Sequence, residues 1–135
     1  MAIIRSFRDL NVYQRARVEG SHVFKATKSF PSEEKFSLTD QIRRSSRAVK
    51  SMVAEAWAHR RYPAAFISKL TDALGEATET QSWLDDALDC GYISISQHKE
   101  PDAARQSSGA SINKMIERSD DFCKNAARPS ILHSR

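Results

Sequence analysis

Residues 63–91 read PAAFISKLTDALGEATETQSWLDDALDCG and show the clearest helical periodicity in the chain. Their apolar residues recur mostly every three or four positions, which places them on one face of a helix. Proline suits the first turn of a helix and glycine commonly follows the last one, so Pro63 and Gly91 mark the two ends. The apolar face consists of Phe66, Leu70, Ala73, Leu74, Ala77, Leu84, Ala87 and Leu88.

A second helix is predicted immediately before this one. Ser37 or Thr39 can cap its N-terminus, and Asp40 is favourable in its first turn. The Tyr62-Pro63 step ends it, because proline cannot donate the next backbone hydrogen bond. Its inward face consists of Ile42, Ser46, Val49, Met52, Val53 and Ala56, with Trp57 at the edge.

Two outer helices show weaker patterns. The first is expected to begin near Asp9, whose carboxylate can cap it, and to end at Phe30-Pro31. The fourth is expected to be kinked or frayed at its start, because Pro, Ser and Gly are poor residues for a helix interior. The apolar positions of the first helix are Tyr13, Ala16, Gly20, Val23, Phe24 and Thr27, and those of the fourth are Ile112, Met115, Ile116 and Phe122.

These patterns predict an all-α, antiparallel, up-down four-helix bundle. Short connections between long helices make sequential helices antiparallel neighbours. A chain of 135 residues fits one domain with one core. We expect the bundle to span residues 1–126 and a basic, disordered tail to span residues 127–135, where the periodicity ends.

Composition excludes several classes of protein. The apolar runs are far too short to cross a membrane, and no signal-peptide pattern begins the sequence. Cys90 and Cys123 lie far apart with no paired spacing, which makes a disulfide framework or a zinc site a poor interpretation. A cytoplasmic protein is therefore expected.

Motifs that carry catalysis or hold metals are missing from the sequence. The helical di-metal motif E-x-x-H occurs once, from Glu19 to His22, and a di-iron site needs two. Asp85, Asp86 and Asp89 have helical spacing rather than the loop used by calcium sites. We expect no enzyme activity, no metal and no cofactor.

Charge is distributed unevenly along the chain. Residues 1–61 hold 13 Lys and Arg against 6 Asp and Glu, whereas residues 62–93 hold 1 against 6. In the second helix Arg43, Arg47 and Lys50 share one face, which could neutralise phosphates. The same cations could equally pair with the acidic third helix, within the chain or between subunits. The candidate phosphate-binding residues are Arg43, Arg44, Arg47, Lys50, Arg60 and Arg61, with Arg15 and Arg17 assisting.

Four segments resemble a bacterial protein family. They are residues 7–14 (FRDLNVYQ), 30–44 (FPSEEKFSLTDQIRR), 52–56 (MVAEA) and 66–79 (FISKLTDALGEATE). These motifs are similar to those of the four-helix-bundle proteins of 23S ribosomal RNA intervening sequences. Met52 and Ala56 depart from the family's usual asparagine and glycine, and Arg47 and Lys50 replace small or neutral residues.

The resemblance implies more than a fold. It implies a barrel-shaped homopentamer with a basic surface, and kinship with accessory proteins of diversity-generating retroelements, which are thought to bind nucleic acid and partner a reverse transcriptase. By position, Arg43 and Arg44 correspond to the family's paired arginines and Glu55 to its motif glutamate. Glu55 then has an ion pair between helices or subunits as its expected role, with an intrahelical contact to Ser51 or His59 as the alternative. Trp57 and Trp83, at stripe edges, are candidate interface residues.

Two hypotheses follow from the sequence. The first is a non-enzymatic, oligomeric protein that binds RNA or structured DNA through the basic face of its first two helices. The second is a protein-interaction module, such as a reverse-transcriptase accessory subunit, whose basic helices dock on the acidic helix of a neighbour.

Overall fold

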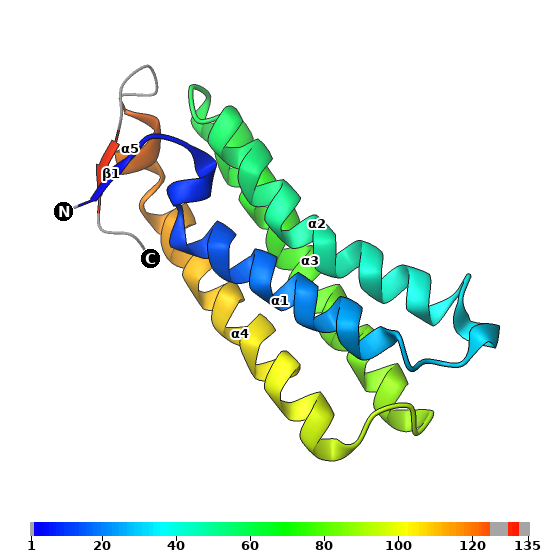
Figure 1. The fold of residues 1–135 in the computed structure, drawn as a ribbon. Helices are drawn as coiled ribbons and strands as arrows, with labels where there is room; N and C mark the ends of the chain where they lie inside the picture. The colour runs from blue at the N-terminus through cyan, green and yellow to red at the C-terminus, as the bar shows by residue number, and fades with distance from the viewer. Residues whose placement is uncertain (1, 125–129, 133–135) are drawn as a thin grey trace.

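The computed structural model describes residues 2–124 and 130–132 and contains four long helices packed in an up-down bundle (Figure 1). The prediction of an all-α bundle is confirmed for the protomer. Its elements in chain order are β1 (Ala2–Ile4), η1 (Phe7–Asp9), α1 (Asn11–Thr27), η2 (Ser32–Glu34), α2 (Leu38–Ala58), α3 (Pro63–Asp89), α4 (Ile95–Glu117), α5 (Ser119–Cys123) and β2 (Ser130–Leu132).

Helix α1 begins later than the sequence pattern predicted. Asp9 does not cap α1. Its carboxylate instead accepts hydrogen bonds from the backbone N–H groups of Arg5 and Ser6, as part of the capping box at the N-terminus of the short helix η1. Leu10 then occupies the N-cap position of α1 without a side-chain cap. The carboxylate is thus used one element earlier than expected.

Helix α3 has the bounds predicted for it, with Pro63 at its start and Gly91 just past its end. Gly91 comes directly after the C-cap residue Cys90. The φ of Gly91 is 76°, a left-handed conformation that glycine adopts without strain. The α1–α2 and α3–α4 connections lie at one end of the bundle, whereas β1 and α5 lie at the other (Figure 1). This arrangement packs α2 against both α1 and α3, and α4 against α1 and α3.

Helix α4 differs from the prediction of a frayed start. It is continuous from Ile95, because Ser94 and Gln97 form a reciprocal capping box that satisfies two N–H groups of the first turn. Pro101 lies inside the helix without ending it. Phe122, expected in the same helix, belongs to α5 and stacks on Phe66 at a centroid distance of 5.7 Å.

The chain ends meet in a small antiparallel ribbon. Ile3 of β1 pairs with Ile131 of β2, a strand that the sequence patterns did not predict. Most of the predicted disordered tail, residues 127–129 and 133–135, lies outside the described residues. That part of the prediction stays a prediction.

Two separate apolar clusters form the core. The larger one, which includes Val49, Val53 and Phe66, occupies the end of the bundle near β1 and α5. The smaller one, which includes Val23, Ile42 and Leu84, occupies the end near the α1–α2 connection. None of the described helices is long and apolar enough to cross a membrane.

Candidate functional site

A basic–aromatic cluster lies where α1 and α2 meet at the surface. The Arg43 guanidinium lies 4.6 Å from the centre of the Phe24 ring, and Arg47 and Lys28 lie 5.3 and 5.2 Å from it. Arg43 also donates from Nε to Thr27 Oγ1 at 2.8 Å. An aromatic face attracts cations, so the ring holds three positive groups together. We call Phe24, Lys28, Arg43 and Arg47 the basic–aromatic cluster.

Helical geometry extends this cluster along the same face. Arg17 precedes Phe24 by seven residues and Lys50 follows Arg43 by seven, and each separation is almost two full turns. The antiparallel packing of α1 and α2 puts Arg17 and Lys50 at similar heights along the bundle. Within the part of the chain that the structure describes, no carboxylate lies within 4.0 Å of these two or of the cluster's three cations.

Arg44 does not belong to this face. It points to the other side of α2 and forms ion pairs with Glu76, at 3.0 Å, and with Glu79 of α3. Partial burial works against its charge, yet these two carboxylates raise the pKa of Arg44 above its ordinary value. Here the acidic third helix is a partner within the same chain.

The remaining predicted cations are dispersed. Arg60 lies about 20 Å beyond Arg47 at the 1.5 Å rise of a helix, with its guanidinium 3.8 Å from the centre of the Trp57 ring. Burial lowers the pKa of Arg60. Arg61 is exposed beside it, and Arg15 turns toward α4, where it donates to Ser107 and Ser111.

The three predicted interface residues have contacts inside the chain. Glu55 lies 3.6 Å from Lys69 of α3, which is an ion pair between helices. Trp57 is buried in the larger apolar cluster. Trp83 is half-buried and donates from its indole nitrogen to Glu79 at 3.0 Å.

A buried polar layer separates the two apolar clusters, and sequence reasoning missed it. Arg105 of α4 is 1% exposed and donates to Glu19 at 3.3 Å and to the backbone and hydroxyl oxygens of Ser46 at 3.1 and 2.8 Å. Ser108 donates to both oxygens of Glu19, at 2.5 and 2.6 Å. We call Glu19, Ser46, Arg105 and Ser108 the polar layer. A serine at an inward position of the second helix was the one sequence feature that pointed to it.

Burial sets the electrostatics of this layer. Desolvation lowers the pKa of Arg105, and the charge of Glu19 acts in the opposite direction. Arginine has five N–H donors, and three hydrogen bonds to described residues use only part of them. In particular, Arg105 Nε has no hydrogen-bond partner among those residues.

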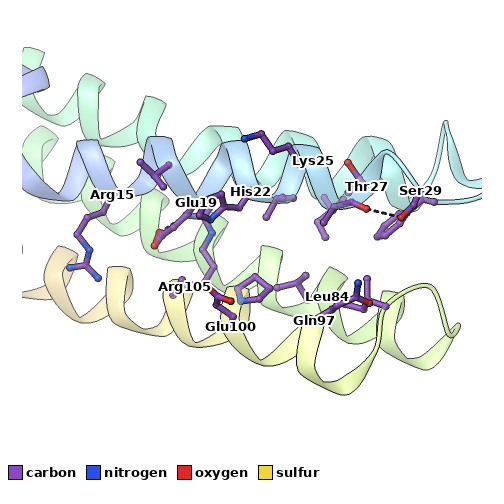
Figure 2. A pocket seen from close by; sticks show the side chains of 18 of the residues that line it. Arg15, Glu19, His22, Lys25, Thr27, Ser29, Leu84, Gln97, Glu100 and Arg105 are labelled. Carbon is purple, nitrogen blue, oxygen red and sulfur yellow. Dashed lines mark hydrogen bonds and ion pairs between the residues drawn. The ribbon is translucent and has the colours of Figure 1, made fainter.

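A groove of about 960 Å³ runs between α1 and α4 and reaches the polar layer (Figure 2). Small or polar residues of α4, such as Gln97 and Ala104, line its α4 side, so little fills the space between the helices. Figure 2 shows Arg15, Glu19 and Arg105 between the two helices and Leu84 further along. The floor of the groove consists of residues of the smaller apolar cluster, namely Val23, Ile42, Leu84 and Ile93.

The described residues contain no group of three or more His, Cys, Asp or Glu side chains able to hold a metal ion. His22 is exposed and lies on the groove, and Asp85 pairs with His98 at 2.8 Å.

Comparison with known proteins identifies the family. A model of the 23S rRNA-intervening sequence protein matches residues 8–118. A crystal structure of a protein of unknown function from the S23 ribosomal protein family of Bacteroides thetaiotaomicron VPI-5482 superposes with a TM-score of 0.72 at 26% identity, covering 78% of this chain and 95% of that one. None of the curated proteins compared with the chain matches it. The family match covers most of the chain and agrees with the helical fold, so this chain belongs to the 23S rRNA-intervening sequence protein family.

Proposed function

We propose that this protein binds RNA or structured DNA through the α1–α2 face and catalyses no reaction. The observation that supports the proposal is the basic–aromatic cluster, in which Arg43, Arg47 and Lys28 surround Phe24. Arg17 and Lys50 extend the positive charge, and no carboxylate of the described residues lies within 4.0 Å of these five cations. Uncompensated, pre-positioned cations suit phosphate groups.

The cluster suits the nucleic-acid backbone rather than the bases. Three cations cover the Phe24 ring, so the ring orients guanidinium groups instead of offering a free face for a base to stack on. Binding through phosphates releases counterions and is insensitive to sequence. With five contacts to a duplex, the slope of log K against log salt is about −4 to −5.

The test is a binding titration of a fluorescent RNA duplex at several salt concentrations. The double substitution Arg43→Gln and Arg47→Gln removes one charge from a half-buried position and one from an exposed position, and circular dichroism checks that the fold is intact. The expected salt slope becomes less steep by about 2, because each lost phosphate contact lowers it by about 1. Arg61→Gln, an exposed change at the far end of the bundle, is the matched control. An unchanged slope and affinity in the double variant would overturn the proposal.

We also propose that the protomer assembles with copies of itself. The homopentamer is what the family resemblance implies, and a reverse transcriptase is the partner protein that it implies. Large apolar side chains at one bundle end support an assembly, since Phe36 is 86% and Ile95 is 79% exposed. Light scattering of the purified protein measures its mass, and Phe36→Ser with Ile95→Ser should reduce that mass. The mass of a single chain for the unaltered protein would contradict the proposal.

A further inference from the structure

The groove between α1 and α4 has chemically different halves. Its inner half reaches the polar layer, where Arg15 and Arg105 line the wall on either side of Glu19. Its outer half runs toward Phe30 over the apolar residues Val23 and Leu84. A site with an apolar body and a few convergent polar groups, in this range of volume, is typical of small-molecule binding.

The inner half carries an excess of positive charge. Arg15 donates only to the hydroxyls of Ser107 and Ser111, at 2.6 and 3.0 Å, so no described carboxylate neutralises it. Arg105 is paired with Glu19 but keeps unused donors, including Nε. The two arginines therefore share one carboxylate. His22, exposed at the rim, adds a further group that can become positive.

The outer half fits an apolar chain. From the height of Glu19 to that of Thr27, its last residue, α1 rises about 12 Å at 1.5 Å per residue. Val23, Ile42, Leu84 and Ile93 form the floor along this distance. Two further charged residues line the groove, Lys25 and Glu100; both are exposed, and neither forms an ion pair within the described chain.

We propose that this groove binds an anionic amphiphile, a fatty acid of medium chain length, with its carboxylate at Arg15 and Arg105 and its alkyl chain over Val23, Ile42 and Leu84. The apolar half continues past the end of α1 to Phe30, so it has room for an extended alkyl chain of about the size of dodecanoate. The carboxylate accepts hydrogen bonds from the unused N–H donors, which are stronger when both groups are charged. Apart from Thr27, which lines the groove and accepts a hydrogen bond from Arg43, this site lies on the other side of α1 from the basic–aromatic cluster. It does not depend on nucleic-acid binding.

The experiment is calorimetric titration of the full-length protein with sodium dodecanoate below its micelle concentration. We expect one site per chain, and affinity for dodecanoate about tenfold or more above that for dodecanol, which lacks the charge. Ala26→Trp places a large ring in the groove from an exposed position and should abolish binding. Ala110→Trp, exposed on α4 and outside the groove, is the matched control and should bind normally.

A second variant tests the head-group assignment. Replacing both members of the buried pair, Glu19→Leu with Arg105→Met, removes charge without leaving either partner alone. Preference for dodecanoate over dodecanol should fall at least severalfold while the groove still accepts the chain. Three outcomes overturn the proposal: no heat with dodecanoate, binding that Ala26→Trp leaves intact, or equal affinity for acid and alcohol in the unaltered protein. A change of molecular mass in Ala26→Trp without dodecanoate binding would assign the groove to a protein partner instead.

Discussion

Removing one partner of the buried Glu19–Arg105 ion pair should destabilise the bundle strongly. The substitution Arg105→Met keeps an unbranched side chain of similar length but leaves Glu19, whose side chain is 12% exposed, without its counter-charge. It also removes both donors to Ser46. Breaking a buried pair in this way costs about 3 to 5 kcal/mol, because an uncompensated charge stays in the interior.

This free energy converts to a measurable change of melting temperature. Unfolding entropy of about 2.1 cal/mol/K per residue gives roughly 0.28 kcal/mol/K for a chain of this length. A loss of about 3 to 5 kcal/mol therefore lowers Tm by roughly 11 to 18 °C. Differential scanning calorimetry or thermal circular dichroism measures it at neutral pH and constant protein concentration.

Two further variants separate the charge effect from packing. The double substitution Glu19→Leu with Arg105→Met removes both charges and should return to within about 1 kcal/mol of the unaltered protein, because the apolar pair needs no counter-charge. Arg118→Met removes a half-exposed ion pair with Asp121 and should cost less than about 1 kcal/mol. A small effect of Arg105→Met, or a double variant no more stable than the single one, would refute the assignment of a buried charge pair.

Two other predictions concern the end of α3. Tyr92 donates to Glu34 at 2.8 Å, and this hydrogen bond raises the pKa of Tyr92 to about 12. The hydrogen bond therefore stabilises the folded protein fully below the ordinary tyrosine pKa, and this stabilisation is lost as pH rises through about 12. Absorbance titration of the native protein should show a late-ionising tyrosine that Tyr92→Phe removes, and titration of all tyrosines together near pH 10 would contradict this. Gly91→Ala meets no neighbouring atom within 4 Å but imposes strain at a φ of 76°, so it should cost about 1 kcal/mol and lower Tm by roughly 4 °C in thermal denaturation. An unchanged Tm would show that the turn tolerates a side chain there.

Sequence periodicity predicted the four main helices because burial of one face imposes a regular spacing on each of them. Phe66 and Leu70 are fully buried as expected, and Pro63 begins α3. Competition between local hydrogen bonds was harder to foresee. Asp9 could cap either α1 or η1. Only the path of the preceding backbone determines which N–H groups donate hydrogen bonds to its carboxylate.

The polar layer could not be predicted from the sequence because it depends on contacts between distant helices. In the sequence, Ser108 is one of the serines that are poor residues for a helix interior, yet its hydroxyl donates to Glu19, 89 positions away in the chain. Arg105 gave no pattern of its own, since a single cation on a polar helix is usually exposed. Its burial goes with hydrogen bonds to two other helices, to Glu19 of α1 and Ser46 of α2.

The distribution of cations was predictable in part. Helical spacing correctly put Arg43 and Arg47 near one another, but it could not show that Arg44 faces the acidic residues of α3. Nor could it place Phe24 of another helix between them. A spacing rule reports which residues share a face, whereas the partner of that face depends on tertiary packing.

Helix α1 separates the two proposed binding surfaces, so their tests can be interpreted independently. At 100° per residue, Arg17, Phe24 and Lys28 point to one side of α1, and Arg15, Glu19 and Ala26 point well over 100° away. The contacts agree, because the first set meets α2 or solvent and the second lines the groove toward α4. Ala26→Trp should therefore leave the salt dependence of RNA binding unchanged. Arg47→Gln should leave dodecanoate binding unchanged, whereas Arg43→Gln also removes a hydrogen bond to Thr27, which lines the groove. Loss of both RNA binding and dodecanoate binding in one variant would mean that the substitution disturbs α1 itself. A lowered melting temperature of the same sample would show this disturbance.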